Sequence, residues 1–296
     1  MSSFSDFKNR SRNNISNLTQ KLEDMNKKDS YKDDRFWRPE LDKSSNGFAV
    51  VRFLPAAGEE DLPWAKYYSH GFQGSGGWYI ENSRTTFGEK DPVSEMNSKL
   101  WNSGSEKDKD IARSRRRKTN YVANIYVVSD PANPQNEGKI FLYRFGQKIF
   151  NKIQEAMQPE FQDEQPVNPF DFWTGADFKL KIRRVSGYIN YDKSEFSSPS
   201  ALFDGDDAKL EELWKKEHLL SEFTDPAKYK SYDELKAKLQ TVIGDDIRAV
   251  IDQKPATVET VEVETPVSKS EDANDSSTEV EESDALTYFE KLAAED

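Results

Sequence analysis

The clearest pattern of hydrophobic and polar positions lies in residues 177–185, where the two kinds alternate. Such alternation is typical of a strand with one face on a core and the other in water. We therefore expect one apolar face and one cationic face. The apolar face holds Phe178, Leu180 and Ile182, and the cationic face holds Lys179, Lys181 and Arg183.

Other apolar segments predict further strands. Residues 47–55 and 140–145 fit single strands, and residues 121–130 carry apolar side chains on both faces, as in a strand buried on both sides. Residues 64–80 fit strands that glycines interrupt. No Lys-Ser or Lys-Thr pair follows these glycines, so a hairpin turn fits better than a phosphate-binding loop.

Helical spacing appears in four places. It predicts one helix across 147–158, one across about 206–218, and one that begins at the capping-box sequence Ser231 to Glu234 and ends near Gly244. The fourth place is N-terminal, where apolar residues recur between Ile15 and Met25. That segment is either a surface helix behind a frayed terminus or part of a basic arm that docks on another molecule.

The tail differs from the rest of the chain. Almost all of the Trp, Tyr and Phe residues lie before residue 232, whereas the segment after Pro255 is mostly Ser, Thr, Glu and Asp. Such a segment buries too little apolar surface to offset its ordering entropy, so we expect a disordered acidic tail. Only its end, with Leu286, Phe289 and Leu292, could form one amphipathic turn.

Charge is distributed as unevenly as the aromatic residues. The chain has a net charge of −12, but the segment from Ala256 to Asp296 holds 13 acidic and 2 basic residues, a net −11. The remainder carries −1. A nearly neutral body with clustered bases can bind nucleic acid despite the acidic whole.

Several kinds of chemistry find no support. The chain has no cysteine, so disulfides and cysteine-ligated metals are excluded. Its two histidines, His70 and His218, are far apart in sequence, and the carboxylates show no spacing typical of paired acid–base work or a metal cage. We expect no enzyme, no catalytic residue and no cofactor. The N-terminus lacks the apolar region of a signal peptide, and no segment approaches the roughly 20 apolar residues of a membrane span.

Basic and aromatic residues adjoin at three places, and such a combination can hold single-stranded nucleic acid. The basic run Arg113–Lys118 leads into Tyr121, Tyr143 precedes Arg144, and the cationic face of 177–185 leads to Tyr188 and Tyr191. Each stacked base would contribute about 1–3 kcal/mol. Each feature also has an ordinary interpretation, because a strand tyrosine often lies in a core and a basic run is often a solvated face.

Long segments of the chain resemble the single-stranded DNA-binding (helix-destabilising) proteins of T-even-type tailed phages. The resemblance covers roughly residues 30–245 and implies an α+β fold, with an OB-fold-type antiparallel β-barrel core, flanking helices and a DNA cleft. The matching segments are NGFAVVRFLP (46–55), SHGF (69–72), WYIE (78–81), RRKTNYVANIYVVSDPANPQNEGKIFLYRFGQKI (116–149), GADFKLKIRRVSGYINYD (175–192) and KYKSYDELKAKL (228–239).

The residues and the resemblance together define a candidate DNA-binding set. The resemblance places Arg116, Arg117 and four tyrosines in the cleft, and Trp101 at an aromatic cleft position with a different ring type. Residues 88–112 diverge, and Lys90 replaces one family tyrosine. The full set is Arg115, Arg116, Arg117, Lys118, Tyr121, Tyr143, Arg144, Lys179, Lys181, Arg183, Tyr188, Tyr191 and Trp101.

The resemblance also implies a different role for each of three segments of the chain. Residues 1–28 would be a basic arm for cooperative self-association through Lys8, Arg10 and Arg12, residues 29–250 the OB-fold DNA-binding core, and residues 251–296 a tail that recruits replication and recombination proteins. We expect cooperative, sequence-independent binding of single-stranded DNA in replication, recombination and repair. The location would be the cytoplasm, that of the bacterial host if a phage encodes the chain. An acidic adaptor that does not bind DNA is the alternative.

Metal binding is where the chain departs from the family it resembles. Better-known members hold a structural zinc ion with one histidine and three cysteines. His70 matches that histidine, Ser83 falls where the first cysteine would be, and residues 91–96 contain no cysteine pair. With Asp91 and Glu95 as the only nearby charged candidates, we expect a protein without metal, in which His70 is structural.

Overall fold

The structure is a computed structural model that describes residues 33–161 and 163–244. The expected arm (1–28) and the acidic tail from residue 251 lie outside the described residues. The chain divides into two compact units, Met1–Phe36 and Trp37–Asp296. Of the first unit only residues 33–36 are described; there Phe36, which begins β1, donates its N–H to the Asp33 carbonyl at 3.0 Å. Everything below concerns the second unit.

A long strand, β5, organises the second unit and pairs with three other strands. Its first half pairs with β3, its second half with β2, and its middle with β6 along the other edge. These pairings are antiparallel, as are those of β7 with β2, β8 and β9. The strands are β1 (Phe36–Trp37), β2 (Gly47–Phe53), β3 (Ala65–Gly74), β4 (Gly77–Asn82), β5 (Lys118–Ser129), β6 (Ile140–Phe145), β7 (Asp177–Val185), β8 (Tyr188–Asn190) and β9 (Glu195–Phe196).

The α+β class is confirmed, but the closed barrel is not. The strand path runs β1-β6-β5-β2-β7-β8, and in the described part of the chain no pairing joins its two ends. Closing a barrel requires that pairing. Helix α5 (Gln147–Met157) places Ile149 and Ile153 in the core that the strands enclose. The sheet is therefore open, with a helix covering part of its inner face.

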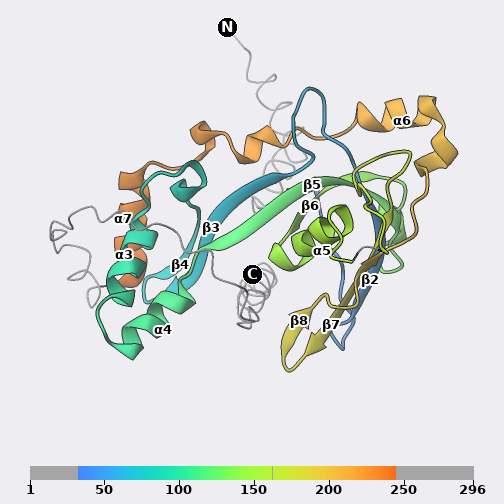
Figure 1. Cartoon of the computed structure of the whole chain (residues 1–296). Coiled ribbons are helices and arrows are strands. Elements are labelled where there is room, and N and C mark those ends of the chain that lie inside the picture. The colour runs from blue at the N-terminus through green and yellow to red at the C-terminus, as the bar shows by residue number, and fades with distance from the viewer. Residues whose placement is uncertain (1–32, 162, 245–296) are drawn as a thin grey trace, which may run out of the picture. The chain divides into compact units, whose positions relative to one another are not determined.

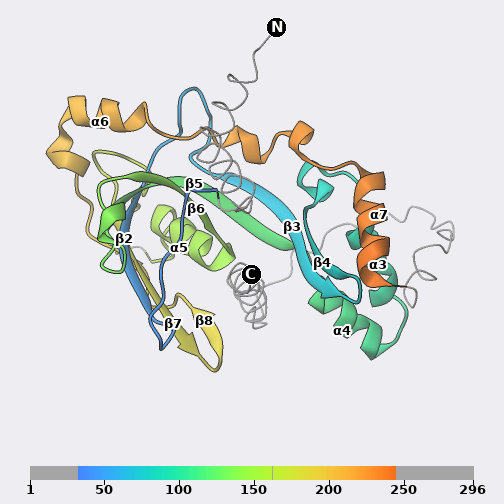
Figure 2. The ribbon, with the colours of Figure 1, turned by 180° about the vertical axis from the view of Figure 1, so that it is seen from behind.

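Three separate cores lie in this unit. The strand lobe, made of β2, β5, β6, β7 and α5, buries a core that includes Val51, Phe53 and Phe178. The helical lobe, made of β3, β4, α3 (Pro92–Trp101), α4 (Glu106–Ser114) and α7 (Tyr232–Ile243), buries another around Tyr79 and Leu235. A third, smaller core lies around α6 (Asp207–Trp214). Figures 1 and 2 show α3, α4 and α7 gathered at one end of β3, with β2 and α6 toward the other end of β5.

Sequence reasoning missed two helices in the helical lobe. Asp91 caps α3 by accepting from two backbone N–H groups, and Pro92 occupies the first turn, where its missing N–H costs nothing. Ser105 caps α4 in a similar way. Both capping residues are visible in the sequence, but we predicted no helix there because residues 88–112 are mostly polar. Besides α5, the α-helices among the described residues are α3 (Pro92–Trp101), α4 (Glu106–Ser114), α6 (Asp207–Trp214) and α7 (Tyr232–Ile243). The 3₁₀ turns are η1 (Arg84–Phe87), η2 (Pro134–Asn136), η3 (Leu202–Gly205), η4 (Ser221–Phe223) and η5 (Pro226–Lys228).

Helix α7 fixes the hairpin between β3 and β4. Its predicted capping box is confirmed, since Ser231 and Glu234 bond reciprocally. At its other end the Val242 carbonyl accepts from Gly76 N–H at 2.8 Å. A Cβ atom at Gly76 would lie 1.9 Å from the Thr241 carbonyl oxygen, so only glycine allows this approach. Each helix among the described residues is too short or too polar to span a bilayer.

The segment after α6 contains a buried carboxyl group. The helix predicted across about 206–218 ends at Trp214, and Glu217 lies beyond it. Both Glu217 carboxylate oxygens are buried with no hydrogen-bond partner in the described residues. Burial, and next the neighbouring carboxylate of Glu60, raises the pKa of Glu217 to about 8. Glu217 therefore keeps its proton in the folded protein at neutral pH.

This buried acid makes stability depend on pH. The folded pKa of Glu217 lies above its ordinary value of 4.5, so the protein loses stability as pH rises between that value and about 8. Glu217→Gln should therefore stabilise the protein at pH 8 and above, by about 1–3 kcal/mol, and have little effect near pH 4. Thermal unfolding of the full chain across pH measures this, with exposed Glu212→Gln on α6 as the control. An equal effect of Glu217→Gln at both ends of the pH range would contradict it.

Candidate nucleic-acid interface

The basic run of residues 115–118 lies where α4 ends and β5 begins, and its members differ in exposure. Arg117 is exposed. Arg115 is half-buried, with its guanidinium carbon 5.1 Å from the centroid of the Phe72 ring, and burial lowers its pKa. Lys118 is buried, with 8% of its surface exposed. Arg116 is half-buried, so Arg117 is the most exposed of the four expected DNA contacts in this run.

Arg117 takes part in a compact group that includes three residues the sequence reasoning missed. Its guanidinium carbon lies 3.7 Å from the centroid of the Tyr68 ring, and its Nη1 donates to the Thr85 hydroxyl at 3.0 Å. Lys66 Nζ lies 5.7 Å from the centroid of the same ring. We name Lys66, Tyr68, Thr85 and Arg117 the clamp group. The register of β3 against β5 brings Lys66 and Tyr68 beside the start of β5, and η1 adds Thr85, so no local sequence signal marks them.

Tyr121 and Tyr143 lie in the core of the strand lobe. Tyr121 is 1% exposed, stacks on Phe150 with the ring centroids 3.9 Å apart, and donates its hydroxyl proton to Gln147 at 3.0 Å. Tyr143 is 4% exposed and packs edge-on against Trp37. Neither ring offers a face to a base in this arrangement, so stacking on DNA would require the core to rearrange.

The cations of β7 are largely matched by acids. Lys181 pairs with Glu195 at 2.8 Å, and Arg183 with Asp192, where Nε and Oδ1 are 3.0 Å apart. These hydrogen bonds and charges hold the pKa values of both carboxyl groups below their ordinary range. Lys179 is half-buried. The predicted alternation of this strand is confirmed, but two of its three outward cations are already paired.

The remaining candidates occupy separate places. Tyr188 is exposed on β8, and Tyr191 packs partly against the strand-lobe core. Arg144 is exposed on β6. Trp101 is 49% exposed at the end of α3, with the Arg113 guanidinium carbon 5.3 Å from the centroid of its ring. The structure therefore spreads the expected set over both lobes.

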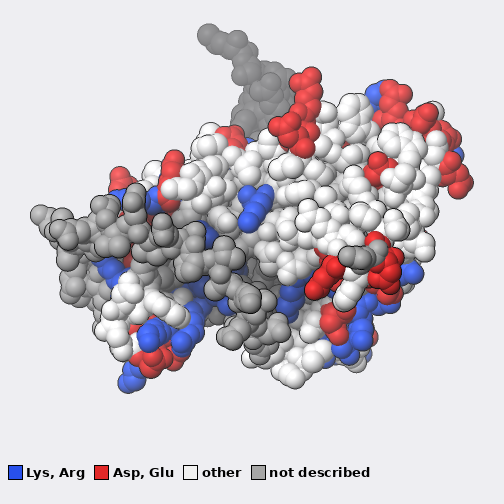
Figure 3. Space-filling view, viewed as in Figure 1, with Lys and Arg blue, Asp and Glu red and all other residues white. Residues whose placement is uncertain are grey.

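Charges of both signs are mixed over much of this face of the unit. Figure 3 shows Lys and Arg side chains at lower left over α4 and at lower right near β7, in both places beside Asp and Glu side chains. Asp and Glu side chains prevail at upper right, over α6. A polyanion approaching this face is therefore least favoured over α6.

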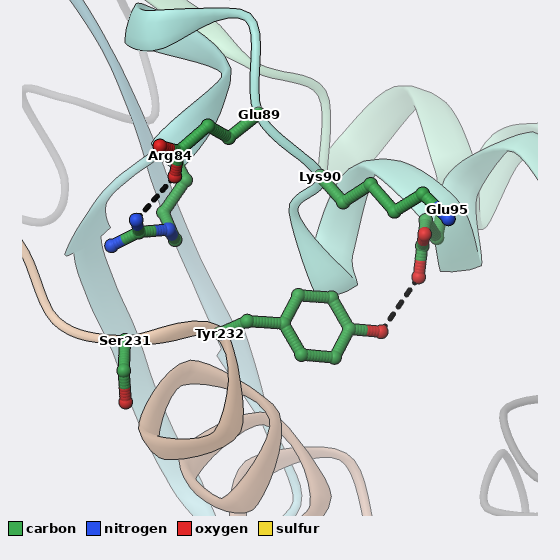
Figure 4. Close-up of a pocket in the computed structure, with 6 residues that line it drawn as sticks. All are labelled: Arg84, Glu89, Lys90, Glu95, Ser231 and Tyr232. Carbon is green, nitrogen blue, oxygen red and sulfur yellow. Dashed lines mark hydrogen bonds and ion pairs between the residues drawn. The ribbon is translucent and has the colours of Figure 1, made fainter.

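A polar hollow of about 550 Å³ lies between η1, α3 and the start of α7 (Figure 4). Tyr232 donates its hydroxyl proton to Glu95 at 2.6 Å, and Arg84 pairs with Glu89. Burial, and next the bond to Glu95, raises the pKa of Tyr232 to about 12. Its acidic groups are engaged and no histidine lines it, so the hollow offers no catalytic arrangement.

His70 is at the centre of a buried polar network in the helical lobe. It is 1% exposed, and its ring nitrogens face the Arg115 carbonyl at 3.2 Å and the Asp91 carboxylate at 3.3 Å. Asp91 also accepts from the Ser83 hydroxyl at 2.9 Å. Burial alone would raise the pKa of Asp91, but hydrogen bonds, first that from His70, hold it below its ordinary value. His70 thus joins β3, α3 and the basic run, as its expected structural role requires.

These residues do not fit the zinc ion that the resemblance implies. The donors are one imidazole, one carboxylate and two hydroxyls, those of Ser83 and Ser94, whereas structural zinc sites use cysteine and histidine. Asp91 already accepts from two backbone N–H groups as the cap of α3. Within the described ranges, no group of three or more His, Asp or Glu side chains could hold a metal. The absence of metal stays a prediction.

Because of this buried network, we expect the stability of the protein to depend on His70 and not on bound zinc. His70→Ala should destabilise the protein by about 1–3 kcal/mol, because it leaves buried acceptors without a partner. Exposed Gln73→Ala on the same strand should change little. Thermal unfolding measures both effects, and elemental analysis should find no stoichiometric zinc. Bound zinc whose removal by a chelator lowers the melting temperature would overturn this prediction.

Comparison with known proteins identifies the family of the chain. Residues 45–243 match the family model described as gp32 DNA binding protein like. The "Single-stranded DNA-binding protein" of Enterobacteria phage T2 is 44% identical over 214 residues, 70% of this chain and 70% of the relative. The protein of the same description from Enterobacteria phage T4 is 43% identical over 225 residues, 74% of this chain and 73% of the relative. The chain therefore belongs to the gp32 DNA-binding-protein-like family.

Proposed function

We propose that this protein binds single-stranded DNA without sequence preference and does not act as an enzyme. The observation that carries the proposal is the clamp group, in which two cations adjoin the ring of Tyr68 on one face of β3 and β5. Single strands are held by cations along the backbone and by aromatic or guanidinium planes against the bases. The family is one of DNA-binding proteins, and the T2 and T4 relatives are named for single-stranded DNA.

The proposed DNA path follows the exposed members of the expected set. Arg117, Arg144, Tyr188 and Trp101 reach solvent without any rearrangement. Lys181 and Arg183 would first have to leave their acidic partners, which lowers what each can contribute. The proposal includes an OB-type core that is not closed into a barrel. Its support is the antiparallel pairing among β2, β5, β6 and β7.

We further propose a role for each end of the chain. Residues 1–28 would bind a neighbouring copy along DNA, and residues 251–296 would contact replication and recombination proteins, with residues 29–250 as the binding core. The support is compositional, with Lys8, Arg10 and Arg12 near one end and most of the negative charge near the other. Opposite charges on two ends favour contacts between successive copies.

The proposal is tested by titrating single-stranded DNA with the full chain at several salt concentrations. Replacing Arg116 and Arg117 by alanine should weaken binding about tenfold and reduce the salt slope by about 0.7 for each phosphate that is no longer neutralised. Lys215→Ala with Lys216→Ala removes the same charge just after the end of α6 and is the matched control. An equal loss in both double variants would assign the effect to net charge and not to this site. No binding by the unaltered chain would favour the adaptor alternative.

Truncation tests the two ends. Deleting residues 1–28 should abolish cooperative filling of long single strands while binding of a short oligonucleotide stays nearly unchanged. Deleting residues 256–296 removes a net −11 and should tighten binding at low salt, where screening is weak. Both effects are measured by fluorescence titration of short and long DNA. Equal losses on short and long DNA without the arm, or unchanged affinity without the tail, would contradict the respective role.

A further inference from the structure

The clamp group contains one cation whose orientation is fixed from two sides. The Tyr68 ring covers one face of the Arg117 guanidinium, and the Thr85 hydroxyl accepts a hydrogen bond from Nη1. In the β3–β5 register Tyr68 lies opposite Thr119, so Arg117 is its diagonal neighbour two residues earlier on the same face. Diagonal neighbours on a sheet lie within reach of aromatic and long side chains. The contact therefore follows from the strand pairing.

The second support is anchored in the buried network. The Ser83 hydroxyl lies 3.0 Å from the Thr85 hydroxyl and donates its proton to Asp91 at 2.9 Å. Ser83 therefore has its oxygen available to accept from Thr85, and Thr85 accepts from Arg117. This hydrogen-bonded chain runs from the exposed guanidinium to a carboxylate that is 2% exposed. An exposed arginine normally samples many rotamers, but these two supports restrict this one.

The backbone of Tyr68 is fixed by the same segment. Its N–H donates to the Thr86 hydroxyl at 3.0 Å, and its carbonyl accepts from Ser83 N–H at 2.8 Å. The turn η1 therefore supports both the ring under Arg117 and the hydroxyl beside it. Such double support is typical of side chains held in a binding geometry before the ligand arrives.

The charge of the clamp group is not matched by an acid. In the described residues no ion pair includes Arg117 or Lys66, although Lys181, Arg183 and Arg113 each have a carboxylate partner. A guanidinium has five N–H donors, and Thr85 uses one. The others remain for an anion, and a phosphate group fits their planar geometry.

We propose that Tyr68 and Thr85 are positioning residues that hold Arg117 ready for a DNA phosphate, with Lys66 as a second cation beside it. This inference rests on the proposed function and deepens it, because it identifies a preorganised subsite on the DNA path. Preorganisation lowers the entropy cost of binding, so loss of either support weakens DNA binding although neither side chain contacts the phosphate. The effect acts through Arg117.

The test uses the full chain and a fluorescent oligo-dT of roughly 8–16 nucleotides, near the length that a single OB-fold site covers. Tyr68→Leu and Thr85→Val should each weaken binding about three- to tenfold. Tyr68→Phe keeps the ring and should bind as the unaltered chain does. Matched controls are Tyr126→Leu on β5, whose ring packs on Phe203, and Thr241→Val on α7. Neither control should change the affinity for DNA.

A double-mutant cycle separates positioning from direct contact. Once Arg117→Ala is present, Tyr68→Leu and Thr85→Val should each cost less than about twofold more, because the group that they position is gone. Full additivity would overturn the inference and assign base stacking to Tyr68. Normal affinity of both single variants would also overturn it, while a weakened Arg117→Ala variant would leave the proposed function intact. An unaltered chain that fails to bind oligo-dT would instead reject the proposed function itself.

Discussion

The pairing of β5 with a different strand along each half of one edge is the constraint on which the rest of the structure depends. Residues Lys118–Val122 bond to β3, and Ile125–Ser129 bond to β2. Between them Asn124 is fully buried and bonds to both the N–H and the carbonyl of His218. A single strand thereby fixes the strand lobe, the helical lobe and the segment that follows α6.

This arrangement separates two uses of positive charge that look alike in sequence. On β7, Lys181 and Arg183 face acids of the neighbouring hairpin, and such exposed pairs contribute little to stability but reduce the local potential. At the start of β5, Arg117 faces an aromatic ring and a hydroxyl, which orient a cation without neutralising it. The partners of a basic residue, more than the number of such residues, thus determine whether it is available to an anion.

Sequence reasoning succeeded where a local signal is sufficient. The bounds expected for β6 and β7, the helix α5 and the capping box of α7 were confirmed, because periodicity and capping are properties of neighbouring residues. It failed where tertiary pairing decides. Residues 121–130 are apolar on both faces, which fits the buried position of Tyr121, yet the adjacent basic run led us to expect this ring at the DNA surface. Lys66 and Tyr68 became visible only through the register with β5.

The two lobes have cores that share no residue. Regions with separate cores can open independently, with free energies below that of global unfolding. Opening of the helical lobe would part β3 from β5 and carry Tyr68 away from Arg117, while the strand lobe stayed folded. The lifetime of the closed helical lobe then limits how long the arginine stays oriented. Local unfolding of the helical lobe, which has little role in the core of the strand lobe, would in this way set the rate at which the protein releases bound DNA.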